Sequence, residues 1–266
     1  MSVLEFRNVT KEYRVRGGSR FRAVDGVSFT LQPGRTIALV GQSGSGKSTI
    51  AKMLAQLERP SSGEILLDGE PVARRGRGLT RYRGEVQMVF QDPFASLNPF
   101  HTIGHHLQRP LLLHGRASGS DVDEQVAKLL ERVQLVPGTS MAERKPHELS
   151  GGQRQRVAIA RALAPAPSIL IADEPVSMLD VSIRLGVLNL LGRLQREENL
   201  GVLYITHDLA TARHFSDEIL VLYKGSVVER GPSNEVILNP QEDYTKRLLA
   251  ASPNPETHFG TGRAAG

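Results

Sequence analysis

Short runs of alternating hydrophobic and polar residues open the chain and predict β-strands. VLEFRNVTKEY (residues 3–13) and AVDGVSFTL (residues 23–31) alternate with a period of two, and GGSR between them is typical of a hairpin turn. TIALV (residues 36–40) is continuous and apolar and ends in a glycine-rich turn, as a buried parallel strand does. GEILLDG and GEVQMVF are further strand candidates.

The pattern changes near Asp92 and changes back after Arg161. DPFASLNPFHTIGHHL is typical of a loop, whereas residues 121–136 have helical periodicity with acidic residues in the first turn. Strand, amphipathic helix and strand then follow in PSILIAD, VSIRLGVLNLLGRLQREE and GVLYITHD, and EILVLYKGSVVERG predicts a final strand pair. The order predicts an α/β core with a parallel sheet, interrupted by a helical insertion at roughly residues 92–164.

Composition places the chain among ordinary globular proteins. Of its 266 residues, 39% are hydrophobic and 23% charged. No apolar run approaches the roughly 18 residues of a spanning helix, and the N-terminus lacks the pattern of a secretory signal, so we expect a cytoplasmic location. The absence of cysteine excludes disulfides, thiolate catalysis, cysteine-ligated zinc and iron–sulfur clusters. The tail from Ser252, rich in Pro, Gly, Ala and Thr, is expected to be disordered.

Positive charge is in modest excess. The net charge is +5, and the densest basic stretch is ARRGRGLTRYRG, with arginines at 74, 75, 77, 81 and 83. It lacks the interleaved aromatic residues of a single-strand nucleic-acid platform. We interpret it first as a solvated loop and second as a contact surface.

The strongest chemical motif is GQSGSGKST, between the strand at residues 36–40 and a predicted helix, TIAKMLAQL. It matches the P-loop pattern G-x-x-x-x-G-K-[ST] through Gly41, Gly46, Lys47 and Ser48. The glycines allow successive backbone N–H groups to face phosphate oxygens. The lysine then contacts the β- and γ-phosphates, and the serine hydroxyl binds Mg²⁺. The motif predicts nucleotide binding.

A second motif, ILIADEP, places Asp173 and Glu174 at the carboxyl end of a buried strand, the edge where α/β proteins bind ligands. Asp173 is expected to hold Mg²⁺, commonly through water, and Glu174 to polarise the attacking water. An Asp-Glu pair after a strand is also a common helix cap or acidic turn. The P-loop elsewhere in the chain favours the catalytic interpretation.

Three further features are ambiguous alone. His207 ends the next strand at the same edge, where it would lie near a γ-phosphate or serve a structural role. The HTIGHH histidines have a loop-like spacing that does not favour a metal site. Gly151 and Gly152 follow Ser150 at a predicted helix start, where glycines cost helix stability but expose N–H groups to an anion.

Taken together, GQSGSGKST, Gln91, LSGGQ, ILIADE, SMLD and His207 resemble the ATPase subunit of an ATP-binding cassette (ABC) transporter, from about residue 3 to 250. The resemblance implies one ABC ATPase domain over residues 1–251, with a P-loop NTPase core, an N-terminal antiparallel β subdomain and an inserted helical subdomain. It implies ATP and Mg²⁺ as ligands. It also implies a head-to-tail dimer, in which the signature of one subunit closes over the ATP held by the P-loop of the other.

The resemblance assigns roles by position. It gives Tyr13 adenine stacking, Gln91 sensing of Mg²⁺, and Asp180 a link between the two sites of the dimer. Glu174, His207 and Gln91 are the implied catalytic residues, and Ser48, Gln91 and Asp173 the implied metal ligands. The implied nucleotide contacts are Tyr13, Gly41, Ser43, Gly44, Gly46, Lys47, Ser48, Thr49, Ser150, Gly151, Gly152, Gln153 and Asp180.

A narrower resemblance is to the ATPases of dipeptide and oligopeptide importers, carried mainly by SLNP and the terminal YTKRLL. It implies two membrane permeases, an external solute-binding protein and a peripheral place on the cytoplasmic face of the inner membrane. Nickel and oligosaccharide importers are similar and stay open. Met178 in SMLD, where the broad family often has Ala, favours a distinct partner ATPase. A nucleic-acid-associated ATPase is disfavoured, because the chain lacks long heptad arms and zinc-binding cysteines.

Overall fold

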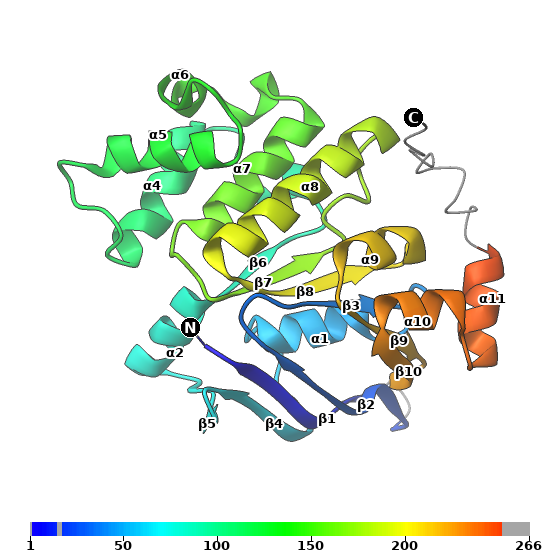
Figure 1. The fold of residues 1–266 in the computed structure, drawn as a ribbon. Coiled ribbons are helices and arrows are strands. Elements are labelled where there is room, and N and C mark those ends of the chain that lie inside the picture. Colours follow the sequence, from blue (N-terminus) through cyan, green and yellow to red (C-terminus); the bar gives the residue numbers. More distant parts are fainter. Residues whose placement is uncertain (1, 15–17, 252–266) are drawn as a thin grey trace, which may run out of the picture.

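A computed structural model describes residues 2–14 and 18–251 and shows two β-sheets with helices between and above them (Figure 1). The smaller sheet contains β1 (Leu4–Arg14), β2 (Arg20–Leu31), β4 (Ser62–Leu67) and β5 (Glu70–Pro71). Its order is β2-β1-β4-β5, and every neighbouring pair is antiparallel. Residues 15–17, which include the first glycine of the predicted GGSR turn, and the predicted disordered tail, residues 252–266, lie outside the described residues.

The larger sheet contains β3 (Thr36–Val40), β6 (Val86–Val89), β7 (Ile169–Asp173), β8 (Gly201–Thr206), β9 (Glu218–Tyr223) and β10 (Ser226–Pro232). Its order is β10-β9-β3-β8-β7-β6, and all pairs are parallel except β10 with β9. β3 is buried over its whole length between β8 and β9. The carboxyl ends of β3, β7 and β8 therefore meet at one edge of the sheet.

Eleven α-helices complete the described residues. They are α1 (Lys47–Leu54), α2 (Gly76–Glu85), α3 (Pro93–Ser96), α4 (Ile103–Leu113), α5 (Val122–Arg132), α6 (Gly138–Glu143), α7 (Gly151–Leu163), α8 (Val181–Glu198), α9 (Leu209–Phe215), α10 (Ser233–Leu238) and α11 (Asp243–Ala251), with a 3₁₀ turn at Pro146–Glu148. Figure 1 shows α1 between the two sheets, and α7 and α8 on the other face of the larger sheet.

Alternation along β3 divides the core between these two faces. Ile37 and Leu39 belong to the cluster that includes α1 and the smaller sheet, whereas Ala38 and Val40 belong to the cluster under α7 and α8. Both faces of the larger sheet are thus covered, which explains why its strands are continuous apolar runs. The predicted α/β class, with a mainly parallel core and an antiparallel β part, is confirmed.

Three local expectations are wrong. The segment expected to be a loop after Asp92 contains α3 and α4, whose N-termini are capped by the side chains of Asp92 and Thr102. The helix expected over residues 121–136 ends at Arg132, because Gln134 adopts a left-handed backbone with a φ of 61°. The basic stretch expected to be a loop forms α2 instead. Helices α3 to α7 lie between β6 and β7 in chain order, and the expected limits of a helical insertion at 92–164 stay a prediction.

Candidate nucleotide site

The glycine-rich loop joins β3 to the N-terminus of α1 and is held by close backbone approaches. Gly46 has a φ of 113°, and a Cβ atom added to it would lie 2.4 Å from the carbonyl oxygen of Ala23. A Cβ on Gly41 would lie 2.3 Å from the carbonyl oxygen of Leu222. Both distances are impossible for a side chain, so glycine is required at both positions. The loop is packed against β2 and β9 before any ligand arrives.

Lys47 is folded back onto this loop. Its Nζ atom donates hydrogen bonds to the carbonyl oxygens of Gly41, at 2.6 Å, and Gln42, at 3.0 Å. Burial lowers the pKa of Lys47, while the charges of Glu174 and Asp173 act in the opposite direction. The ammonium group therefore occupies the centre of the loop, where negatively charged phosphates are its natural partners.

Glu174 lies across the cavity from Lys47, after the end of β7, and two side chains contact one of its carboxylate oxygens. Gln91 Nε2 donates to Glu174 Oε2 at 3.2 Å, and His207 Nδ1 lies 3.2 Å from the same oxygen. The backbone of Glu174 has a φ of 44°, and its N–H donates to the carbonyl oxygen of Ile205 at 2.9 Å. A left-handed conformation is costly for this residue type, so the surrounding contacts hold the carboxylate in its orientation.

Asp173, one residue earlier, has a perturbed carboxyl group. Burial, followed by repulsion from Glu174, raises its pKa to about 6, and Lys47 opposes the shift. A buried carboxylate with a raised pKa is suited to accept a cation. Among residues 2–14 and 18–251, no cluster of three or more His, Asp or Glu side chains is arranged to hold a metal ion. Mg²⁺ usually takes only one or two carboxylates from a protein and keeps waters and phosphate oxygens as its other ligands, and the single carboxylate of Asp173 fits that requirement.

A cavity of about 880 Å³ joins these groups. Of the predicted site residues, it is lined by Tyr13, Ser43, Gly44, Gly46, Lys47, Ser48, Thr49, Gln91, Glu174 and His207. Gly41 does not line it but supplies a carbonyl oxygen to Lys47. Asp173 lines an adjoining groove that shares Ser48 and Gln91 with the cavity.

The cavity also contains residues that the sequence did not single out, namely Phe21, Ala23, Gln42, Arg184, Asp208, Leu248 and Ala251. Arg184 lies in the first turn of α8, and Leu248 in α11, near the end of the described chain. No motif spacing links Arg184 or Leu248 to the P-loop. Only the fold brings them to the cavity.

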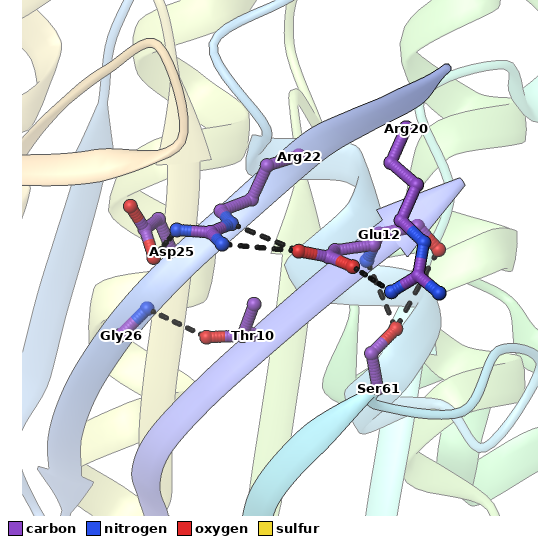
Figure 2. Close-up of polar contacts among 7 residues, drawn as sticks. All are labelled: Thr10, Glu12, Arg20, Arg22, Asp25, Gly26 and Ser61. Atoms are coloured by element: carbon purple, nitrogen blue, oxygen red, sulfur yellow. Dashed lines mark hydrogen bonds and ion pairs between the residues drawn. The ribbon is translucent and has the colours of Figure 1, made fainter. Parts of the chain in front are cut away.

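The rim of the cavity at Tyr13 is stabilised by a network of charges centred on Glu12 (Figure 2). Arg22 donates to Glu12 Oε1 and to Asp25 Oδ1, and Arg20 donates to Glu12 Oε2 at 3.1 Å. These arginines, through hydrogen bonds and charge, lower the pKa of Glu12. The network adds side-chain contacts between β1 and β2 beside Tyr13. The Nζ atom of Lys11 lies 4.9 Å from its centroid, in a cation–π contact.

The LSGGQ segment lies away from this cavity. Ser150 Oγ accepts a hydrogen bond from the Gln153 backbone N–H, and Gln153 Oε1 accepts one from the Ser150 N–H, which forms a capping box at the start of α7. Gly152 is explained by packing, because a Cβ there would lie 2.6 Å from Ile183 Cγ2 on α8. None of Ser150, Gly151, Gly152, Gln153 and Asp180 lines the cavity, and Ser150 and Asp180 are exposed.

The fold and cavity define a P-loop nucleotide-binding protein of the α/β class. A model of the ABC transporter family matches residues 24–177, more than half of the chain. The chain therefore belongs to the ABC transporter family, and the expected ATP-binding cassette is confirmed.

Curated relatives include the glutathione import ATP-binding protein GsiA of Escherichia coli (strain K12), 48% identical over 261 residues, and that of Salmonella typhi, 44% identical over 265 residues. Both alignments cover 96% of this chain but 42% of the relative, so the chain spans less than half the length of these proteins.

Two solved structures are similar throughout. One is cbiO1 from Clostridium perfringens, part of the ABC transporter complex cbiONQ, with a TM-score of 0.77 and 28% identity over 89% of this chain and 90% of that chain. The other is a dimeric post-hydrolysis state of the cassette MJ0796 bound to ADP and Pi, with a TM-score of 0.76 and 32% identity over 86% of this chain and 98% of that chain. Among the described residues of this chain, no helix is both long and apolar enough to span a bilayer.

Proposed function

We propose that this chain binds and hydrolyses ATP to energise an importer of small peptides. The observation that carries the proposal is the convergence of Lys47, Glu174, Gln91 and His207 on one cavity beside the buried carboxylate of Asp173. The naming of its relatives as glutathione import proteins supports a peptide-like solute, since glutathione is a short peptide. The SLNP and YTKRLL segments favour the same class.

In the proposed reaction, the β- and γ-phosphates replace the carbonyl oxygens of Gly41 and Gln42 as partners of the Lys47 ammonium. Glu174 accepts a proton from the attacking water, and Gln91 and His207 hold its carboxylate in place. Ser48, Gln91 and Asp173 would hold Mg²⁺, which neutralises charge on the phosphate oxygens when it is bound.

We further propose that the LSGGQ helix serves the ATP of a partner subunit. Ser150 at the N-terminus of α7 is exposed and lies outside the cavity, so its backbone and hydroxyl are accessible to a second molecule. Asp180, which precedes α8, is also exposed, and Met178 is 52% exposed. The dimeric state of the similar cassette MJ0796 supports this arrangement.

The complete transporter would contain a second, distinct ATPase, two permeases and an external solute-binding protein. The present chain would act from the cytoplasmic face of the inner membrane as a peripheral subunit. Closure of the two ATPases over two ATP molecules, and their reopening after hydrolysis, would be coupled to two states of the permeases.

Paired substitutions test the site. Lys47→Ala should weaken binding of a fluorescent ATP analogue by at least about tenfold, since a charge-assisted contact to phosphate is lost. Lys128→Ala, which removes an exposed lysine of α5, is the control and should leave the affinity unchanged.

Glu174→Gln should retain ATP binding but slow phosphate release by about 100-fold or more at sites containing Glu174, because the general base is removed. The assay uses this chain together with its partner ATPase. Unimpaired hydrolysis by Glu174→Gln would exclude Glu174 as the base, and equal ATP binding by Lys47→Ala and the control would exclude the P-loop as the phosphate site.

A further inference from the structure

The exposed arginines of α2 and of the turn before it form a surface that the nucleotide site does not use. This arginine patch consists of Arg74, Arg75, Arg77, Arg81 and Arg83, all of which are exposed. Among the residues that the structure describes, none of the five forms an ion pair with a carboxylate. The chain has 33 basic and 28 acidic residues, so the patch accounts for its entire excess of five positive charges.

Packing does not explain why α2 carries these residues. Tyr82 is the one buried residue of the helix, with 3% of its surface exposed, and its hydroxyl donates to the carbonyl oxygen of Leu54 at 2.6 Å. Gly76 begins the helix with a φ of 63°, a backbone conformation that favours glycine. Glu85, the last residue of the helix, accepts hydrogen bonds from the backbone N–H and the side chain of Ser168. These contacts hold the C-terminal end of the helix, and the arginines are exposed to the surroundings.

Exposed leucines lie near the C-terminal end of α2. A Cβ on Gly84, near the end of α2, would lie 3.2 Å from His114 Nδ1, so α2 ends against the C-terminus of α4. Leu112 and Leu113 of α4 precede that histidine and are 44% and 74% exposed. Arginines beside exposed leucines suit the boundary between lipid headgroups and acyl chains, where guanidinium groups contact phosphates and leucines enter the apolar layer.

We propose that the arginine patch, with Leu112 and Leu113, binds the surface of an anionic lipid membrane. A nucleic acid also offers phosphates, but a single-strand site uses exposed aromatic rings for stacking, and Tyr82 within the patch is buried. The inference rests on the proposed role at a membrane transporter. It adds a direct contact with lipid to the contacts with permeases.

Sedimentation with unilamellar vesicles tests the contact on the full chain. We expect binding to vesicles that contain phosphatidylglycerol, weak binding to vesicles of phosphatidylcholine alone, and release at high salt because exposed charges are screened. The triple substitution Arg74→Gln, Arg75→Gln and Arg77→Gln should weaken binding by at least about tenfold. None of these three side chains takes part in the hydrogen bond between Tyr82 and Leu54, so that contact is kept.

A matched control removes three charges elsewhere, with Arg59→Gln, Lys246→Gln and Arg247→Gln. Two of these lie on α11, on the opposite side of the molecule from α2 (Figure 1). The control should bind vesicles like the unmodified chain. Equal binding by the two triple variants, or no preference of the unmodified chain for anionic vesicles, would overturn the proposal. Preferential binding of a labelled oligonucleotide over vesicles, lost in the patch variant, would assign the patch to nucleic acid instead.

ATP binding in the absence of vesicles separates this inference from the proposed function. The patch variant should bind the fluorescent ATP analogue as the unmodified chain does, because no patch arginine lines the cavity. If the unmodified chain binds no ATP, the proposed function fails, whatever the vesicles show.

Discussion

At neutral pH the carboxyl group of Asp173 is ionised, although its burial in the metal-free protein disfavours the negative charge. Its pKa is raised from 3.8 to about 6 in the folded chain, chiefly by burial. The protonated carboxyl group is favoured in the folded chain. Its contribution to stability is therefore complete below pH 3.8, the pKa in the unfolded chain, and is lost as the pH rises through about 6, the pKa in the folded chain. At neutral pH the residue therefore costs stability, and we attribute its presence to the cation that it would hold.

Asp173→Asn should consequently stabilise the nucleotide-free and magnesium-free protein. At pH 8 we expect the free energy of unfolding to rise by about 2 kcal/mol, because the buried charge is removed. The gain should shrink as the pH falls below 6 and disappear near pH 4. Urea unfolding at several pH values measures it, with Asp243→Asn, a side chain that is 90% exposed, as the control. A destabilised or pH-independent variant would contradict the assignment of the shift to Asp173.

Residues in the P-loop and after β7 were predictable from the sequence because their chemistry depends on short spacing. Gly41 and Asp173 each follow an apolar run, and Lys47 stands at a fixed spacing from Gly41 in the P-loop pattern. The role of Gln91 could be predicted only from the family resemblance, since a glutamine after a strand has no distinctive pattern. Its hydrogen bond to Glu174 joins positions 83 residues apart. Arg184 and Phe21 carried no local signal at all.

At the scale of elements, the sequence predictions failed where helices begin at positions that have the composition of a loop. The segment after Asp92 has the prolines and glycines of a loop, yet Asp92 and Thr102 cap two helices there. α2 was missed because Gly76, Gly78 and the arginines are poor indicators of a packed helix, and its anchor is a contact between Tyr82 and Leu54 across the fold. The strands were easier, because burial on both faces leaves continuous apolar runs.

The anchor of α2 is tested by Tyr82→Phe. The substitution keeps the buried ring but removes the hydroxyl, which leaves the carbonyl oxygen of Leu54 without its partner. We expect a loss of about 1–2 kcal/mol in the free energy of unfolding and faster amide exchange along α2. Tyr13→Phe offers a comparison, because that hydroxyl has no hydrogen bond among those described. Unchanged exchange in α2 would show that other contacts hold the helix.

The N-terminus of α7 leads to a different prediction, since the site that we propose it serves lies on another subunit. Ser150→Leu should leave ATP binding by the isolated chain nearly unchanged and reduce hydrolysis at the P-loop of the partner. Loss of the cap should cost about 1 kcal/mol of stability. Ser120→Leu, in an exposed loop, controls for the added apolar surface. Collapse of ATP binding in the isolated Ser150→Leu chain would contradict the action in trans.

At the scale of the whole molecule, the carbonyl group of Ala23 in β2 lies where the smaller sheet packs against loops of the larger sheet. A Cβ on Gly46 would lie 2.4 Å from this oxygen, and one on Gly225 would lie 3.0 Å from it. The backbone of Asp25 also donates to the carbonyl oxygen of Gly225 at 2.8 Å. Contacts between residues about 200 positions apart are beyond sequence periodicity, which predicts elements but not which of them touch.

Gly225→Ala tests this junction. Its φ of 90° and the short approach to Ala23 should together cost more than about 2 kcal/mol of stability and weaken ATP binding. Gly69→Ala is the matched control, because Gly69 has a φ of 80° but nothing within 4 Å of an added Cβ. Its cost should stay near 1 kcal/mol, with ATP affinity unchanged. Equal losses in both variants would mean that strain alone, not the junction, matters.

The junction at Ala23 has a consequence for ligand choice. Tyr13 belongs to the sheet that contains Ala23, and the P-loop packs closely against Ala23. Tyr13 and the P-loop line the same cavity, so the two ends of the cavity belong to the two different sheets. A ligand that joins a base to phosphates offers a group to each end. Binding of such a ligand therefore adds a contact between the two sheets beside the junction at Ala23.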